Sequence, residues 1–250
     1  MNNITKKDHS RSTEKALKLL DCFIAKEEWG ISELARELDL GKASVSRLVA
    51  AFEGHKFLMK NEATEKYRLG IRLMFFGLLF QERNELTNVL APIMQNLAQK
   101  YQATAHLGVQ YGTEVLIISK TSAGSFFYMV SRIGATLSSH ASASGKCLLA
   151  YQDPEQIEQY LKKASLNPLT EKTITDPKSF IEELAIVRQQ GYALDDEEYT
   201  EGLYCLAVPL LDMSGKPIAA LSLSGSKETL KKREKEMAKD LIAEIKQLSF

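Results

Sequence analysis

Polar side chains that could bind a small molecule lie late in the chain. Cys205 belongs to a strand-like segment, and Ser222 and Ser224 share one face of the next, because side chains alternate along a strand. A run of carboxylates, residues 195–198, precedes them. Two hydroxyls, a thiol and one carboxylate could therefore line a small polar pocket. The alternative is that the acidic run is only a solvated turn.

A second candidate is the segment of small residues from Ser138 to Lys146, which runs into the apolar residues 147–150. Small residues are predicted to open a helix there. The free N–H groups and the partial positive charge of a helix start can bind an anion. The alternative is a tight helix start that packs under a sheet.

Enzymatic and metal chemistry have little support in the sequence. Cys205 and His140, together with an acid, have the residue types of a nucleophilic triad. However, the sequence contains no nucleophile elbow, phosphate-binding loop or dinucleotide fingerprint. The histidines are scattered, and Cys22, Cys147 and Cys205 show neither zinc-site nor disulfide spacing. We therefore expect no catalytic residue, no metal ligand and no cofactor, and hence no enzyme.

The N-terminal part carries a different signal. Residues Ile31 to Glu53 contain two apolar stripes at helical spacing, and only Asp39-Leu40-Gly41 separates them. Asp39 occupies a turn position that often needs a left-handed backbone, which Asp tolerates. Two helices joined by so short a turn cross steeply, as in a helix-turn-helix unit. The alternative is an ordinary helical hairpin with a solvated polar face.

The outer face of the second helix could approach a DNA duplex closely, because it carries short residues and one long cation. Hydroxyls suit phosphates and base edges, and arginine is well shaped to read guanine. The candidate DNA-binding residues on this helix are Lys42, Ala43, Ser44, Ser46 and Arg47.

Two flanking elements complete a winged helix-turn-helix. A helix from Glu14 to about Lys26 is expected before it, capped by Ser12 or Thr13. Two short strands around a polar turn, residues 57–60 and 65–69, form a β-hairpin after it. The cations of this wing could touch phosphates, or they could be solvated while the hairpin only packs on the core; they are Lys60, Lys66 and Arg68.

The next segment, Ile71 to about Arg83, is apolar on several faces, so it must be buried. We expect the same helix of a second subunit to cover it, with burial inside one chain as the alternative. An apolar helix with Pro92 near its start follows. The expected divisions are residues 1–72, a DNA-binding domain; 73–88, a linker and dimerisation helix; and 89–250, a ligand-binding domain.

From Thr104 the hydrophobic period changes from 3.6 to 2, which predicts an α+β domain on an antiparallel sheet. Its expected strands are residues 104–110, 115–120, 126–131, 203–210 and 217–224. Its expected helices are residues 154–163, 177–190, closed by Gly191, and 229–248. The chain shows neither a transmembrane run nor a signal peptide, so we expect a cytoplasmic protein without a membrane partner.

Several long motifs, in order, resemble those of the IclR family of bacterial transcriptional regulators, over nearly the whole chain. They are residues 13–20, 32–35, 42–48 and 67–70, His140-Ala141-Ser142 with Gly145-Lys146, and residues 191–193, 195–198 and 202–209. The resemblance implies a winged helix-turn-helix, a linker helix and a GAF-like effector domain. It also implies a homodimer, often paired into a homotetramer, on near-palindromic double-stranded operator DNA. The implied ligand is a small-molecule effector, often a carboxylate or an aromatic compound from a catabolic pathway.

The resemblance also implies a pocket. Its polar positions correspond to Ala143, Ser144, Asp195, Cys205, Ser222 and Ser224, and its apolar wall to Met129, Leu137 and Leu203. Ala143-Ser144 stands where members that bind small keto acids carry Gly-Ala, which adds a hydroxyl. In the recognition helix, Ala43-Ser44 stands where Ser-Thr is usual in the family, which removes one hydroxyl. We expect an effector-controlled transcription factor, a repressor rather than an activator; the alternative is a ligand-sensing module whose helix-turn-helix makes protein contacts.

Overall fold

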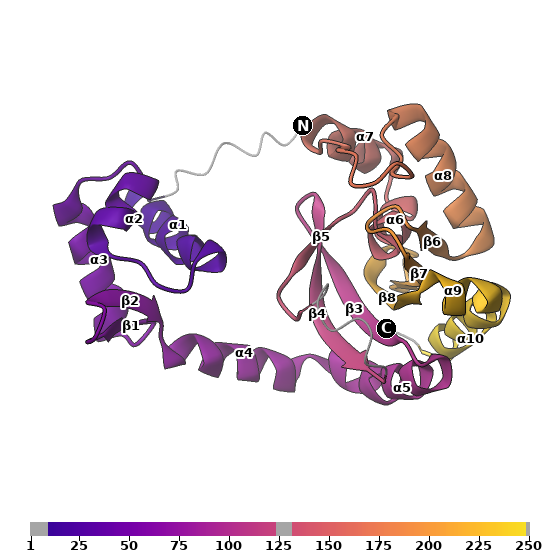
Figure 1. Cartoon of the computed structure of the whole chain (residues 1–250), viewed down its shortest axis with the longest axis horizontal. Helices are drawn as coiled ribbons and strands as arrows, with labels where there is room; N and C mark the ends of the chain where they lie inside the picture. The colour runs from indigo at the N-terminus through magenta and orange to yellow at the C-terminus, as the bar shows by residue number, and fades with distance from the viewer. Residues whose placement is uncertain (1–9, 124–131, 249–250) are drawn as a thin grey trace. The chain divides into compact units, whose positions relative to one another are not determined.

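A computed structural model of the chain describes residues 10–123 and 132–248 (Figure 1). The chain divides into two compact units, the first ending at Asn84 and the second beginning at Glu85. No helix among the described residues is long and apolar enough to cross a membrane.

Three helices form the body of the first unit: α1 (Arg11–Ala25), α2 (Ile31–Glu37) and α3 (Lys42–Gly54). They pack around a buried cluster that includes Leu19, Leu34, Val45 and Leu58. Asp39 has φ +51°, which confirms the left-handed turn. The predicted cap was wrong: α1 begins at Arg11, because the N–H of Glu14 already bonds to the carbonyl of Ser10 at 3.1 Å and places Ser12 inside the first turn.

The wing is the antiparallel pair β1 (Leu58–Asn61) and β2 (Lys66–Leu69). Trp29 and Tyr67 exchange two backbone hydrogen bonds of 2.9 Å, which join the wing to the chain before α2. The carboxylate of Glu28 accepts a hydrogen bond from Asn61 Nδ2 at 2.6 Å. The wing is therefore held in a defined position on the three-helix body.

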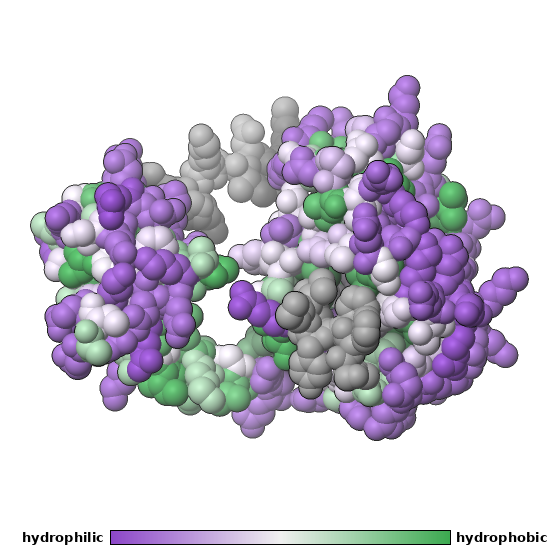
Figure 2. Space-filling view, in the orientation of Figure 1, coloured by the Kyte–Doolittle hydropathy of each residue, from purple (hydrophilic) through white to green (hydrophobic). Residues whose placement is uncertain are grey.

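Helix α4 (Ile71–Arg83) has the predicted bounds, and none of its residues is buried. Phe76 stacks on Phe57 of the same unit, with ring centroids 5.8 Å apart. Phe75 and Leu78 are 57% and 53% exposed. Figure 2 shows hydrophobic side chains gathered along this helix. Large apolar side chains left in water are unfavourable, so this surface needs a cover.

Within the described residues, the second unit contains one six-stranded antiparallel sheet with the order β5-β4-β3-β8-β7-β6. Its strands are β3 (Thr104–Tyr111), β4 (Glu114–Ser122), β5 (Thr136–Ser138), β6 (Ala193–Asp196), β7 (Leu203–Leu211) and β8 (Pro217–Ser226). The α+β fold class predicted from the change of period is confirmed. The predicted strand 126–131, which includes Met129, lies outside the described residues.

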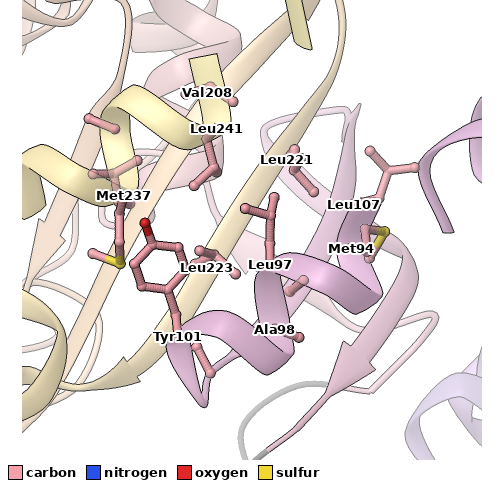
Figure 3. Packing of buried hydrophobic residues seen from close by; sticks show 14 of the residues in the cluster. Met94, Leu97, Ala98, Tyr101, Leu107, Val208, Leu221, Leu223, Met237 and Leu241 are labelled. Carbon is pink, nitrogen blue, oxygen red and sulfur yellow. The ribbon is translucent and has the colours of Figure 1, made fainter. Parts of the chain in front are cut away.

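Helices cover both faces of this sheet. On one face, α5 (Glu85–Tyr101) and α10 (Glu234–Lys246) bury a cluster of side chains against β3, β7 and β8, with Leu97, Leu223 and Met237 among them (Figure 3). On the other face lie α6 (Ala143–Ala150) and α8 (Pro177–Gln190). Helix α7 (Pro154–Lys163) packs beside α8 through Tyr160 and Phe180.

Three elements of this unit differ from expectation. Pro92 lies well inside α5, because the helix extends back to Glu85 and buries Leu90. The expected helix 229–248 is broken into α9 (Lys227–Leu230), a 3-10 turn (Lys231–Arg233) and α10, and Leu230 and Met237 reach the core on either side of the break. The acidic run begins inside a strand, since β6 alternates and buries Ala193 and Asp195.

Candidate functional site

A cavity lies between the start of α6 and the sheet. Its empty volume is about 520 Å³, a figure that includes the space open to solvent at its mouth. Its described lining residues are Thr104, His106, Leu137, Ser142, Ala143, Ser144, Asp195, Tyr199, Leu203, Cys205, Ser222 and Ser224. The structure thus brings together the predicted effector-binding residues except Met129, which lies outside the described residues. Thr104, His106, Ser142 and Tyr199 were not predicted.

The sheet contributes two polar rows that run across its strands. The first row pairs Asp195 of β6 with Cys205 of β7, Cys205 with Ser224 of β8, and Ser224 with Thr104 of β3. The second pairs Ser222 with His106, two residues along. Directly opposed residues share a face of the sheet, so these side chains all point toward α6.

The start of α6 is held very close to the preceding loop. Ser142 Oγ caps the helix by accepting the N–H of Gly145 at 3.2 Å. A Cβ on Gly145 would lie 2.2 Å from Ser139 Cα, so only glycine fits there. The N–H groups of Ala143 and Ser144 have no acceptor among the described residues. Two amide donors are therefore left for a ligand, since the N–H of Gly145 is used by the cap.

Asp195 is the buried acid of the pocket, 1% exposed. Its Oδ1 accepts the N–H of Glu198 at 2.8 Å and the N–H of Tyr199 at 3.1 Å. Burial raises the pKa of Asp195 to about 6, although the two N–H groups and the charge of Lys146 oppose this shift. The carboxyl group is therefore mostly ionised near pH 7.

The remaining titratable side chains of the pocket are neutral near pH 7. Burial raises the pKa of the Cys205 thiol well above its usual value. Burial lowers the pKa of His106 to about 3, and the charge of Lys120 acts in the same direction. None of the described lining residues is Lys or Arg. The donors of the described lining are therefore all neutral groups, chiefly backbone amides and hydroxyls.

Within the described residues, Cys205 and His140 are not brought together as a nucleophilic triad requires. The Nε2 atom of His140 lies 3.0 Å from the carbonyl oxygen of Asn167, and His140 does not line the cavity with Cys205. The described residues also contain no group of three or more His, Cys, Asp or Glu side chains that could hold a metal ion.

A buried ion-pair cluster lies behind Asp195. Lys146, 1% exposed, places its Nζ 3.1 Å from Glu183 Oε1 and 2.5 Å from Glu198 Oε1. Burial raises the pKa of Glu198 to about 7, while the charge of Lys146 acts against this. The residue types alone gave no signal for this cluster, because its members are far apart in the chain.

The candidate DNA-binding residues of α3 lie on one surface. Lys42, Ala43, Ser46 and Arg47 are exposed and Ser44 is half-buried, whereas Val45 and Val49 point into the core. In the wing, Lys60 pairs with Glu65, and Lys66 Nζ lies 3.1 Å from Glu33 Oε1. Arg68 is exposed and has no ion pair among the described residues. The charges of Lys60 and Lys66 are thus partly neutralised within the unit.

Comparison with known families decides the identity. The model of the bacterial transcriptional regulator IclR C-terminal domain matches residues 80–250, and that of the IclR helix-turn-helix domain matches residues 12–62. The chain belongs to the IclR family. Its homologues are helix-turn-helix transcriptional regulators, so membership implies DNA binding by the first unit and effector binding by the second.

Individual IclR-family relatives agree over most of the chain. The transcriptional repressor IclR of Escherichia coli (strain K12) is 31% identical over 219 residues, 86% of this chain and 80% of its own length. The regulator KdgR of the same organism is 32% identical over 217 residues, which cover 87% of this chain and 82% of KdgR. An IclR homologue from Microbacterium hydrocarbonoxydans, solved in complex with 4-hydroxybenzoate, is 25% identical with a TM-score of 0.79, covering 95% of this chain and all (100%) of its own.

Proposed function

We propose that this IclR-family protein is a repressor that binds a near-palindromic operator as a dimer and is released by a small hydroxy or keto carboxylate. The observation that carries the effector class is the cavity at the start of α6. There, two amide donors without an acceptor among the described residues, together with several hydroxyls, face one buried carboxylate. A bacterial regulator of this kind works in the cytoplasm, where its operator lies.

The carboxylate of the effector belongs at the helix start. The N–H groups of Ala143 and Ser144 have no acceptor in the described part of the chain, and the first turn of a helix carries partial positive charge. Ser222 and Ser224 add hydroxyl donors from the sheet opposite. Hydrogen bonds to a charged group are roughly twice as strong as neutral ones, so these donors favour an anion over a neutral ligand.

The hydroxyl or keto end belongs near Asp195. An ionised Asp195 repels a second carboxylate but accepts a hydrogen bond from a hydroxyl or a hydrated carbonyl. Leu137 and Leu203 bound the apolar part of the ligand and limit its length. The relative solved with 4-hydroxybenzoate supports this class, since that ligand carries a carboxylate and a hydroxyl.

The DNA-binding and repressor roles are proposed for named surfaces. Arg47 and Ser44 of α3 would contact base edges and phosphates, with Lys42, Ala43 and Ser46 beside them and Lys60, Lys66 and Arg68 reaching the flanking backbone. The exposed apolar surface of α4 would be covered by the α4 of a second subunit, and two dimers could pair into a tetramer. Repressors among the relatives support the direction of regulation.

The effector class is tested by calorimetric titration of the whole protein with hydroxy acids, keto acids and uncharged aromatics. Ser222→Ala should weaken binding of the best acid about tenfold or more, because it removes one hydrogen bond to a charged ligand. DNA affinity without effector should not change. Ser119→Ala, on β4 outside the cavity, is the matched control.

Binding only of uncharged aromatics, with an affinity that Ser222→Ala does not change, would contradict the carboxylate class.

Operator binding is tested separately, by selecting duplexes from a random pool and titrating salt, since phosphate contacts make binding steeply salt-dependent. Failure to select any duplex would favour a helix-turn-helix that contacts protein instead.

A further inference from the structure

The ion-pair cluster behind the effector cavity holds more acids than bases. The buried Nζ of Lys146, on α6, contacts Oε1 of Glu183, on α8, and Oε1 of Glu198, in the loop after β6. Asp195 of the cavity wall belongs to the same cluster, because its Oδ1 accepts the N–H of Glu198 at 2.8 Å and the charge of Lys146 acts on it. Three carboxyl groups thus share the charge of one ammonium group, so the cluster carries excess negative charge when all three are ionised.

The acids on the outer side of the same loop have cations of their own. Asp196 and Glu197 pair there with three lysines near the surface, which are Lys172, Lys227 and Lys231. These pairs balance one another. Among the described residues, Lys146 is the only cation paired with Glu183 or Glu198.

On the cavity side, the titratable neighbours of Asp195 are neutral near pH 7. Burial raises the pKa of the Cys205 thiol and of the Tyr199 hydroxyl, and it lowers the pKa of His106 to about 3. Lys120 and Glu114, both on β4, carry opposite charges and act on His106 and Tyr199 respectively. The cavity side therefore supplies no net charge that would balance the cluster.

One oxygen of Glu198 is poorly placed to carry a charge. Glu198 Oε2 is buried and has no hydrogen-bond partner among the described residues. An ionised oxygen in such a place lacks both water and a donor, so the neutral carboxyl group is favoured. Burial raises the pKa of Glu198 to about 7; the charge of Lys146 opposes this shift, and the charges of Asp195 and Glu183 add to it. Since the pKa of Asp195 is about 6, both groups titrate close to neutral pH.

We propose that the effector anion binds together with one proton, which the buried pair Asp195 and Glu198 takes up from the solvent. The inference rests on the proposed carboxylate effector, whose negative charge would enter the cavity that Asp195 lines. A further anion in this poorly solvated place disfavours ionised carboxylates beside it. Because the two carboxyl groups interact, the proton belongs to the pair rather than to either residue alone.

Proton uptake makes the affinity for the effector depend on pH in a defined direction. The affinity should rise as pH falls from about 8 to about 6, because the free protein lacks the proton at the higher pH and the bound protein holds it. Uptake of one proton corresponds to a rise of about tenfold per pH unit. Below about pH 6 the free pair already holds a proton, so the dependence should level off. The regulator would thus respond to acidification as well as to its effector.

The competing explanation is that Glu198 stays ionised as a permanent partner of Lys146. The effector would then bind without a proton, and its affinity would be the same at pH 6 and pH 8. His106, Cys205 and Tyr199 cannot imitate proton uptake in this range, because each of them is neutral throughout it. The number of protons taken up per bound ligand therefore separates the two explanations.

The experiment is calorimetric titration of the full-length protein with lactate, pyruvate and 4-hydroxybenzoate, whose carboxyl groups are ionised from about pH 6 to about pH 8. Titrations at pH 7.5 in HEPES, triethanolamine and Tris, which differ in ionisation enthalpy, give the number of protons taken up. For the acid that binds best, we expect between about one half and one proton, and an affinity that rises about tenfold or more from pH 8 to pH 6.

Two neighbouring acids provide a matched pair of variants. Glu198→Gln removes one carboxyl group of the pair and keeps a side-chain oxygen for Lys146, so it should take up about half as many protons or fewer. Glu197→Gln is the control, because hydrogen bonds from Lys172 and Lys227 lower the pKa of Glu197 to about 2 and keep it ionised throughout the range. Its proton uptake should equal that of the wild type. The proton count and pH profile of the wild type test the proposal even if Glu198→Gln does not fold.

Binding of an acid without proton uptake, or with equal affinity at pH 6 and pH 8, overturns the inference and leaves the carboxylate effector class standing. Proton uptake by Glu198→Gln equal to that of the wild type overturns the role of the pair. If none of the three acids binds and only uncharged aromatics do, the proposed effector class fails and this inference fails with it.

Discussion

The carboxylate of Asp195 and the backbone N–H of Glu198 are joined by a hydrogen bond of 2.8 Å. Glu198 in turn holds the buried ammonium group of Lys146. The acid in the effector cavity is thus tied, through one short loop, to an ion-pair cluster behind it. The ionisation of Asp195 consequently bears on the stability of this unit as well as on its ligand.

Stability should fall as pH rises from about 4 to about 6 because of Asp195. Its pKa is raised from 3.8 to about 6, so the folded protein retains a proton that the unfolded chain has lost in this window. The expected loss is roughly 3 kcal/mol, from about two pKa units at 1.36 kcal/mol each. Urea denaturation of wild type and Asp195→Asn at pH 4 and pH 7 measures it, and the decrease should be smaller in the variant by this amount, because the raised pKa of Glu198 contributes a decrease in both proteins.

Asp212→Asn is the opposite control for that measurement. Hydrogen bonds from Ser214 and Lys216 lower the pKa of Asp212. Its contribution to the free energy of unfolding is therefore present at neutral pH and is lost as pH falls through the acid range. Equal pH slopes in wild type and Asp195→Asn would show that Asp195 titrates normally in the folded protein.

Arg47→Ala should weaken specific operator binding by about 1–3 kcal/mol, the usual discrimination of one side chain that reads a base. The melting temperature should not change, since Arg47 is exposed and does not belong to the buried cluster of this unit. Fluorescence anisotropy with a selected duplex measures the affinity. Arg188→Ala, an exposed arginine on α8, is the control, and an unchanged affinity for Arg47→Ala would exclude α3 as the reading helix.

Phe75→Asp combined with Leu79→Asp should weaken dimerisation and, with it, operator binding. Covering each large apolar side chain of α4 is worth roughly 1.5–3 kcal/mol. Analytical ultracentrifugation measures the dimer. Phe76→Ala is the contrasting variant, because Phe76 stacks on Phe57 of its own chain and should affect the first unit's stability more than assembly. A wild-type monomer at micromolar concentration would refute the interface.

Gly145→Ala should destabilise the effector-binding unit by about 1–3 kcal/mol, the usual cost of overpacking. The added methyl group would lie 2.2 Å from Ser139 Cα, and backbone atoms cannot move aside easily. Differential scanning calorimetry measures the loss. Gly54→Ala, where a methyl group meets nothing within 4 Å among the described residues, should unfold at or above the wild-type temperature, since alanine favours a helix more than glycine does. If both variants behave alike, the close approach of α6 to its preceding loop is not tight in solution.

Local patterns in the sequence by themselves determined the helix-turn-helix, the wing and the bounds of α4. These elements depend on residues close in the chain: Asp39 needs only its own left-handed backbone, and the stripe around Val45 needs only helical spacing. The same holds for α8 and its end at Gly191, which has φ +84°. Such local patterns can be interpreted without knowing which residues pack against them.

Only the tertiary structure decided what surrounds the pocket. Alternation along β3 places Thr104 and His106 on one face, but the pairing with β8 decides that this face meets Ser222 and Ser224 under α6. Likewise, the sequence shows Asp195 only as one acid in a charged run. Its burial depends on the pairing of β6 with β7. The physical reason is that strand register and burial are set by residues more than a hundred positions apart in some pairs, as between His106 and Ser222.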